Sequence, residues 1–279
     1  MVHTQIRERL SKMDLIKEFE PQRLHGGKKS WYTGATFLPG DSFVLVDYCN
    51  SRCCLYDSAC NFVSEISFSA TPWDVCHIKG NIIAISFPHK NKIEFLAAND
   101  TFESLLTANT KRACYGLSSL DEDHLVFSGY SNEEWRDCWG IIDKTGEEKF
   151  YHELQGDSSR DQSYVALNST KTQVYITWSN RKVLQCFGIE GDFKFSIELM
   201  DKPLGVCVNI DGSIFVLGHS SNSIHHISPS GELLNEISKD IPRESCKICT
   251  SLNKTYILIT NRHKETRDRC FIYYARCRR

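Results

Sequence analysis

The chain lacks any long apolar run: no stretch of its 279 residues approaches the roughly 20 apolar residues that span a bilayer. Residues 1–10 also lack the apolar core of a secretion signal. The formal net charge is only −2, which offers no general attraction to nucleic acid or to anionic membrane. We therefore expect a cytoplasmic, monomeric protein that does not contact membranes.

Sequence signatures of catalysis and of metal binding are also absent. No nucleophile elbow and no phosphate-binding glycine loop is visible. The 13 cysteines show no zinc spacing, since Cys53 and Cys54 are adjacent and Cys246-x-x-Cys249 stands alone. Most cysteines fall within apolar runs, so we expect reduced thiols that fill the core rather than a disulfide framework. We expect no cofactor and no metal.

What the chain does contain is a repeat. Residues 33–67 and 204–238 each hold four short apolar runs separated by turn residues. The most apolar run starts at Phe43, Ile82, Leu125, Val174, Ile214 and Tyr256, with spacings of 39, 43, 49, 40 and 42 residues. Six units of about forty residues with four strands each are typical of a β-propeller. We predict an all-β fold, a six-bladed β-propeller of four-stranded antiparallel blades.

The last unit is one strand short, and a matching segment lies at the other end of the chain. Residues 14–19 resemble the outer strands predicted at 63–67 and 234–237. Pairing residues 14–19 with residues 270–274 closes the ring and leaves no open edge there. We therefore predict one propeller domain, residues 13–279, preceded by a tail or helical stub at residues 1–12.

The first unit carries a motif around its second turn, Asp47-x-x-Asn50-x-Arg52-x-x-x-Tyr56-Asp57. This motif resembles NHL-type repeats, and looser versions cover about residues 14 to 279. The whole is similar to the C-terminal propeller of animal tripartite-motif proteins, but the RING and B-box modules of that family are absent. The resemblance implies a recognition module for protein or, in some members, for RNA. It does not carry over ligase activity.

Some six-bladed propellers are metal-dependent lactonases or lyases, with a site on the axis where the inner strands begin. Aligning the units places six residues there: Gly34, Asp74, Gly116, Tyr164, Gly205 and Lys247. Metal-assisted hydrolysis needs several converging carboxylates or imidazoles, and this ring has one carboxylate. We therefore expect that the chain is not an enzyme. In this interpretation Asp74, Tyr164 and Lys247 mark the channel entrance, and a metal-dependent hydrolase is the least favoured alternative.

Aromatic and basic residues gather in the links between second and third strands and in the links between units. On loops, such residues often anchor interfaces. The candidate partner-binding residues are Trp31, Tyr32, Trp73, Tyr115, Tyr130, Trp135, Arg136, Arg181, Lys182 and Arg262. Trp73 and Tyr115 have an alternative role as wedges between blades, because each lies beside the start of an inner strand.

Two classes of function remain open, a module that binds a protein or peptide and a propeller that binds RNA. The near-neutral net charge favours a protein partner. A continuous positive field over the candidate rim would favour RNA, and a mixed or apolar patch would favour protein.

Overall fold

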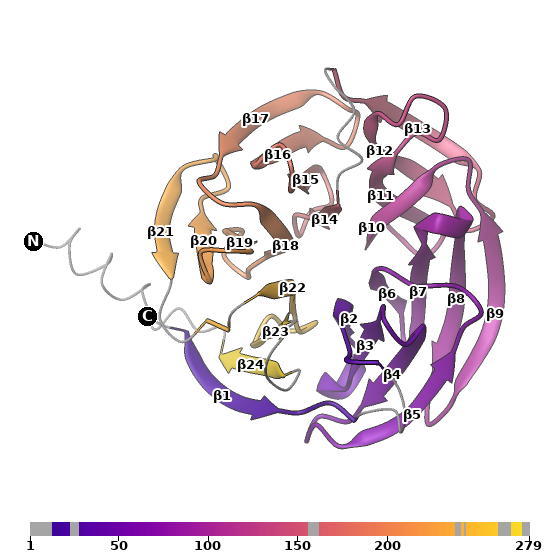
Figure 1. Ribbon diagram of the computed structural model, residues 1–279. Helices are drawn as coiled ribbons and strands as arrows, with labels where there is room; N and C mark the ends of the chain where they lie inside the picture. Colours follow the sequence, from indigo (N-terminus) through magenta and orange to yellow (C-terminus); the bar gives the residue numbers. More distant parts are fainter. Residues whose placement is uncertain are drawn as a thin grey trace, which may run out of the picture.

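The computed structural model describes residues 13–22, 28–155, 162–237, 241–242, 244–261 and 269–274. These residues form six sheets of four antiparallel strands, arranged as a ring around a central axis (Figure 1). The predicted six-bladed β-propeller is therefore confirmed. Residues 1–12, for which a tail or helical stub is predicted, lie outside the described residues.

In the first three blades the strands follow one another from the axis outward. Blade 1 contains β2 (Tyr32–Phe37), β3 (Phe43–Asp47), β4 (Arg52–Tyr56) and β5 (Phe62–Ser67), with the 3-10 turn η1 (Pro39–Asp41). Blade 2 contains β6 (Val75–Lys79), β7 (Ile82–Phe87), β8 (Lys92–Ala98) and β9 (Phe102–Asn109), with η2 (Pro88–Lys90). Blade 3 contains β10 (Ala113–Ser119), β11 (His124–Tyr130), β12 (Asp137–Asp143) and β13 (Glu148–Glu153).

The next two blades repeat this order, and the sixth combines both ends of the chain. Blade 4 contains β14 (Ser163–Leu167), β15 (Gln173–Trp178), β16 (Val183–Gly188) and β17 (Phe193–Glu198). Blade 5 contains β18 (Pro203–Val208), β19 (Ile214–Gly218), β20 (Ser223–Ile227) and β21 (Leu233–Ile237). Blade 6 contains β22 (Ser245–Thr250), β23 (Tyr256–Asn261), β24 (Cys270–Tyr274) and β1 (Asp14–Phe19).

The N-terminal strand closes the ring as the sequence predicts. β1 pairs antiparallel with β24, from Asp14 opposite Tyr274 to Phe19 opposite Cys270. Phe19 also reaches blade 1, where its ring lies 5.6 Å from that of Phe43 and 5.7 Å from that of Tyr56, measured between centroids. The closing strand therefore stabilises two blades.

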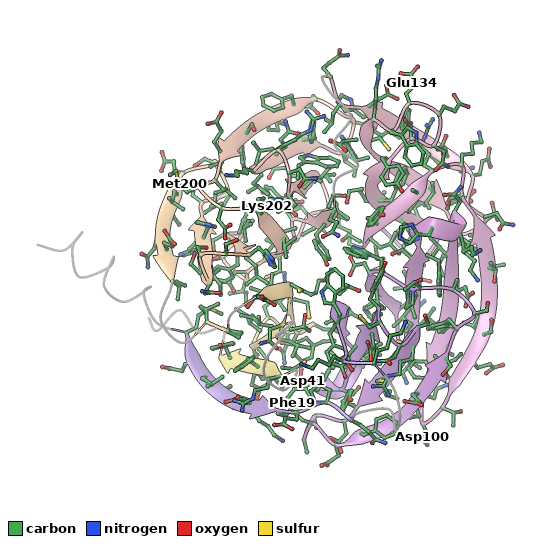
Figure 2. The ribbon with its side chains drawn as sticks, in the orientation of Figure 1. Phe19, Asp41, Asp100, Glu134, Met200 and Lys202 are labelled. Carbon is green, nitrogen blue, oxygen red and sulfur yellow. The ribbon has the colours of Figure 1, made fainter. Side chains whose placement is uncertain are left out.

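Burial explains the strand sequences. β3, an apolar run on both faces, is buried at every position because its blade packs between two neighbours. The outer strand β5 alternates half-buried and exposed residues, as expected of a strand with one face to solvent. Apolar clusters such as Val44, Val46, Ile83 and Ile85 fill the space between adjacent blades. In Figure 2, Glu134 and Met200 lie at the outer edge of the ring.

The two rims of the propeller differ in construction. One rim, here called the loop face, carries the second-to-third-strand links and the connections between blades, including 48–51, 68–74, 88–91, 110–112 and 131–136. The other, here called the turn face, carries the tight turns between first and second strands and between third and fourth strands, including 38–42, 57–61 and 80–81.

Candidate functional site

The six residues predicted at the start of the inner strands do surround the axis, and they alternate glycine with a larger side chain. A Cβ atom on Gly34 would lie 2.9 Å from the Cα of Asp74, and one on Gly116 would lie 2.8 Å from the Cα of Tyr164. Neighbouring inner strands approach so closely that only glycine fits at these places. The larger side chains therefore come from the even blades alone: Asp74, Tyr164 and Lys247.

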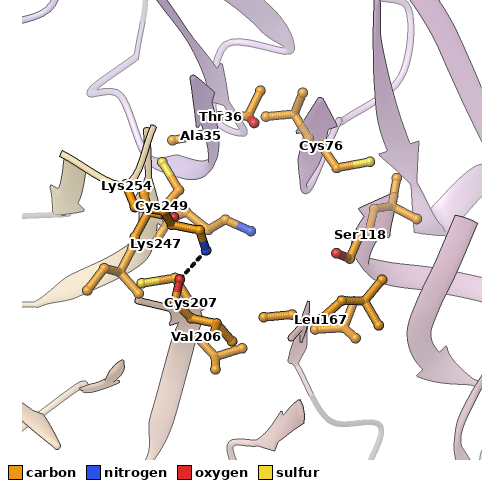
Figure 3. Close-up of a pocket in the computed structure, with 17 residues that line it drawn as sticks. Ala35, Thr36, Cys76, Ser118, Leu167, Val206, Cys207, Lys247, Cys249 and Lys254 are labelled. Atoms are coloured by element: carbon orange, nitrogen blue, oxygen red, sulfur yellow. Dashed lines mark hydrogen bonds between the residues drawn. The ribbon is translucent and has the colours of Figure 1, made fainter. Parts of the chain in front are cut away.

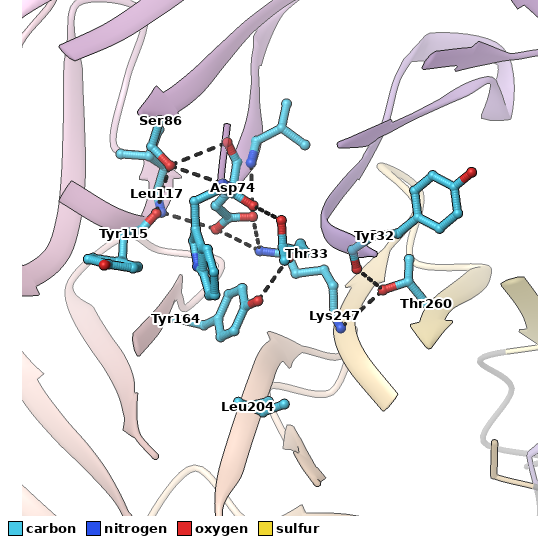
Figure 4. Close-up of polar contacts among 12 residues, drawn as sticks. Tyr32, Thr33, Asp74, Ser86, Tyr115, Leu117, Tyr164, Leu204, Lys247 and Thr260 are labelled. Atoms are coloured by element: carbon cyan, nitrogen blue, oxygen red, sulfur yellow. Dashed lines mark hydrogen bonds and ion pairs between the residues drawn. The ribbon is translucent and has the colours of Figure 1, made fainter. Parts of the chain in front are cut away.

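Lys247 and Asp74 form a buried ion pair at the axis (Figure 4). The ammonium nitrogen of Lys247 lies 2.6 Å and 2.8 Å from the two carboxylate oxygens. The backbone N–H groups of Val75 and Leu117 donate to the same carboxylate, at 2.9 Å and 3.2 Å. Burial raises the pKa of the Asp74 carboxyl, and the Lys247 ammonium opposes that rise. The pair has four satisfied contacts, as a buried charge requires.

Tyr164 completes this axial cluster. Its hydroxyl donates to the backbone carbonyl of Thr33 at 2.9 Å, and the Lys247 ammonium lies 4.9 Å from its ring centroid. Burial raises the pKa of Tyr164 well above its ordinary value, so the phenol stays protonated at neutral pH. One hydroxyl in the second strand of each even blade donates to the next blade's inner strand: Ser86 to Tyr115 O, Thr177 to Leu204 O and Thr260 to Tyr32 O. These hydroxyls connect each even blade to the odd blade that follows it, while the Asp74–Lys247 pair joins two even blades.

On the loop face, aromatic rings contact one another in an unbroken series from blade 1 to blade 3. The centroid distances are 5.7 Å for Trp31–Trp73, 5.1 Å for Trp73–Tyr115, 5.5 Å for Tyr115–Tyr130 and 5.3 Å for Tyr130–Trp135. We call these five residues the aromatic arc. Trp73, Tyr115 and Tyr130 are buried, Trp31 is half-buried, and Trp135 is 38% exposed. The arc therefore combines a rigid base with an exposed end.

One tyrosine predicted to bind a partner, Tyr32, is buried, and another tyrosine on the loop face, Tyr48, was not predicted. Tyr32, a predicted partner-binding residue, is fully buried in the core of blade 1. Tyr48 was missed, although its ring packs edge-on against Trp31 at 5.1 Å and Trp73 at 5.5 Å. The sequence could have indicated Tyr48, because it is an aromatic residue directly after the second strand of blade 1, where a link of the loop face begins.

The two predicted arginine anchors are held in ion pairs. Arg136 contacts Glu134 at 2.8 Å and Glu153 at 3.0 Å, and its side chain remains 45% exposed. Arg181 contacts the buried carboxylate of Asp137, which belongs to the preceding blade, at 2.7 Å. Arg181 therefore clamps two blades together, whereas Arg136 still presents part of its guanidinium to solvent.

Charge is distributed unequally between the two faces. Lys182 is exposed as predicted, and Arg262 lies outside the described residues. The exposed lysines of the loop face are Lys28, Lys29, Lys90, Lys111, Lys182 and Lys202. The exposed acids of the turn face are Asp100, Asp121, Glu122, Asp123, Glu147, Glu190, Asp192, Asp211 and Glu232. Both faces also carry the opposite charge: Glu133 and Glu134 are exposed on the loop face, and Lys79, Lys144, Lys171 and Lys194 on the turn face. Three of these lysines pair with turn-face acids, so the loop face has only an excess of positive charge and the turn face only an excess of negative charge.

The motif that resembles NHL repeats has a structural role in blade 1. Asp47 accepts a hydrogen bond from Asn50 at 2.8 Å and one from Arg52 at 3.1 Å. The same guanidinium donates to Glu65 on the outer strand at 2.7 Å and to the carbonyl of Gln22 at 2.8 Å. Arg52 is fully buried, so its hydrogen bonds hold the link 48–51 and the outer strand β5 in place from the interior of the blade.

The described residues hold no group of three or more His, Cys, Asp or Glu side chains placed to bind a metal ion. None of the helices in this described part is long and apolar enough to cross a membrane. The twelve cysteines in the described ranges form no disulfide, and nine of them are buried.

No family model and no curated protein matches the chain. Its fold is similar to that of virginiamycin B lyase from Staphylococcus aureus, with TM-score 0.63 and 16% identity over 89% of this chain and 82% of that one. It is also similar to XC5397, a gluconolactonase from Xanthomonas campestris, with TM-score 0.69 and 11% identity over 94% and 97%. The Cps50 (Swd1) β-propeller domain of Myceliophteria thermophila gives TM-score 0.61 and 10% identity over 95% and 100%.

These structural neighbours contradict the expectation that the chain is not an enzyme, and they support the NHL resemblance only at the level of the fold. The expectation that the chain is not an enzyme, drawn from the axial residues, is wrong, because proteins named as a lyase and a gluconolactonase share this propeller. Counting axial carboxylates was too weak a criterion, since the axis also holds an ammonium and a phenol in contact. The resemblance to NHL and tripartite-motif proteins is supported only as a six-bladed propeller. At 10–16% identity the comparisons establish the fold alone.

Proposed function

We propose that the propeller is a recognition module whose loop face binds an acidic segment of a protein partner. The observation that carries this proposal is the aromatic arc. Its buried members hold Trp135 and Trp31 in place, so little side-chain entropy is lost when a partner packs on them. Tryptophan and tyrosine are the residues that most often dominate binding energy at interfaces.

The link that presents Trp135 is built to hold it outward. Trp135 has a positive φ of 59°, in a region that side-chain-bearing residues rarely adopt. Its N–H donates to the carbonyl of Ser131 at 3.0 Å, and the N–H of Arg136 donates to the Ser131 hydroxyl at 3.2 Å. Backbone strain at an exposed aromatic favours a functional role for this link.

The exposed lysines around the arc favour an acidic partner. Lys28 lies in the segment that leads to Trp31. The link of Lys90 contacts the arc through His89, whose ring lies 6.1 Å from that of Tyr115, and Asn132, in the link of Trp135, donates to the backbone carbonyl of Lys111 at 2.6 Å. The field is mixed, because Glu133 and Glu134 lie in the same link as Trp135. A mixed field beside an aromatic patch favours protein over RNA, whose phosphates need a continuous basic surface.

The test is binding of two labelled probes, an acidic peptide containing aromatic residues and a single-stranded RNA of similar charge. We expect the peptide to bind, and Trp135→Ala and Arg136→Ala each to weaken it by about 1–2 kcal/mol. Phe193→Ala is the matched control, since Phe193 is an aromatic side chain 59% exposed on the outer strand β17.

The outcomes separate the faces and the partner classes. Preferential binding of the RNA, lost in Lys90→Glu and Lys111→Glu, would replace the protein partner by nucleic acid. Binding that survives both loop-face changes and is lost after substitutions at Asp41, Asp211 or Gly231 would place the site on the turn face.

A further inference from the structure

A cavity of about 170 Å³ lies on the axis beyond the Asp74–Lys247 pair, toward the turn face (Figure 3). All six inner strands contribute to its wall. Inner-strand residues two places after the axial ring point to the same side as the ring, because side chains alternate along a strand. These six residues are all small: Thr36, Cys76, Ser118, Ala166, Cys207 and Cys249. The axis is hollow here because no side chain at this level is large enough to fill it.

The charged residues that line the cavity are all basic. Of the 17 lining residues, two are lysines, Lys247 and Lys254, and none is acidic. Lys247 is paired with Asp74, whereas the ammonium of Lys254 hydrogen-bonds a neutral group, the backbone carbonyl of Val208. The hydroxyls of Thr36 and Ser118 make no hydrogen bond to another described residue, so they are available to a ligand in the cavity.

Lys254 lies in the turn between β22 and β23, with a positive φ. Its φ is +58°, a value for which the corresponding turns of blades 2 and 5 use Gly80 and Gly212. Burial lowers the pKa of Lys254, which means that its charge is poorly solvated where it stands. An anion beside it would compensate that charge.

We propose that this cavity is a binding site for a small monocarboxylate. The carboxylate is held by the Lys254 ammonium and the Thr36 and Ser118 hydroxyls. The hydrocarbon part contacts the three thiols and aliphatic side chains such as Val206 and Leu167. A volume of about 170 Å³ is close to that of an engineered cavity of about 150 Å³ that binds benzene, which has as many non-hydrogen atoms as butyrate. The turns on this side carry both charges, Asp121 and Asp211 with Lys79 and Lys171, so the one ammonium in the lining without a carboxylate partner matches a singly charged anion best.

The chain offers a matched control for Lys254. In blade 4, Lys171 has φ +57° in the corresponding turn, and its ammonium donates to the carbonyl of Leu120 in blade 3. Lys254 does the same from blade 6 to Val208 in blade 5. Both lysines therefore connect adjacent blades, but only Lys254 lines the cavity.

The experiment is calorimetric titration of the full chain with butyrate, with its neutral isostere butyramide and with inorganic phosphate. We expect saturable binding of butyrate, weaker binding of phosphate and none of butyramide. Lys254→Met should weaken butyrate about tenfold or more, because a charge-assisted hydrogen bond is lost. Lys171→Met should leave the affinity unchanged. Thr36→Val, which keeps the shape of the side chain, should weaken it less.

Three results would overturn the proposal: no saturable binding of butyrate, equal binding of butyramide, or equal loss in Lys171→Met and Lys254→Met. If Lys254→Met unfolds, Ala166→Leu replaces it, because a larger side chain fills the cavity from a different blade and should abolish binding. Retained affinity in a folded Ala166→Leu protein would also contradict the site. None of these variants changes a residue of the aromatic arc. A negative result for butyrate binding would therefore not count against the proposed recognition function of the loop face.

Discussion

Lys247 donates hydrogen bonds of 2.6 Å and 2.8 Å to the two carboxylate oxygens of Asp74, although 173 residues separate them in the chain. The ion pair joins blade 6 to blade 2 at the axis, where both side chains are almost completely removed from solvent. Breaking a buried pair on one side is costly, because it leaves an uncompensated charge.

We therefore expect Lys247→Met to lower the free energy of unfolding by about 3–5 kcal/mol. The double variant Asp74→Asn/Lys247→Met should recover much of this loss, because the amide oxygen still accepts from the backbone N–H groups and carries no charge. Urea unfolding measures both. Equal destabilisation in the single and double variants would show that the charge of Asp74 is not what makes the single change costly.

The closing strand gives a second prediction. Deleting residues 1–20 removes β1, unpairs β24 and withdraws Phe19 from Phe43 and Tyr56. We expect a loss of about 2 kcal/mol from the half-buried Phe19 ring and the unpaired strand ladder together, and a less cooperative thermal transition. Deleting residues 1–12 is the control, because it leaves β1 in place. A deletion of residues 1–20 that melts like the control would contradict the closing role of β1.

The sequence was sufficient for the architecture because a propeller repeats. The spacing of apolar runs from Phe43 to Tyr256 and the missing sixth outer strand determined the blades and the closure of the ring. The alignment of the units also placed Asp74 and Lys247 at equivalent positions. It could not show that they touch, because contact across the axis depends on the number of blades and the radius of the ring.

The sites were harder to predict, because exposure is a property of the assembled blades. Tyr32 and Trp135 are both aromatic residues near a link, yet the first is fully buried and the second is 38% exposed. The cavity corresponds to no motif in the sequence. It results from six small residues, each separated from the next by about forty positions, of which Thr36 and Cys249 are the first and last.

The free cysteines give a third prediction. Nine of the twelve described cysteines are buried, and burial raises the pKa of the Cys114 thiol to about 12. Buried neutral thiols react slowly, because the thiolate is the nucleophile. We expect thiol titration in denaturant without reductant to recover nearly all 13 cysteines, and titration of the native protein to label only a few rapidly. Recovery of only a few in denaturant would indicate disulfides instead.

The last prediction concerns His225 and His226 on β20. Their side chains are 5% and 1% exposed, and none of their ring nitrogens has a hydrogen-bond partner among the described residues. Burial lowers the pKa of both imidazoles below the ordinary value of 6.5. The carboxylates of Glu236 and Asp201 near His225, and of Asp211 near His226, oppose this shift only in part.

The sign of the pH dependence follows from that direction. The unfolded chain takes up protons near pH 6.5 that the folded protein does not, so stability is fully present above this pH and falls as the pH decreases. Each histidine contributes at most about 1.4 kcal/mol for each pH unit below its ordinary pKa. Urea unfolding between about pH 7.5 and pH 5.5 should therefore show a falling midpoint. The His225→Gln/His226→Gln variant should have a shallower slope. A midpoint that stays constant in the wild type would mean that both imidazoles bind protons as readily in the folded protein as in the unfolded chain.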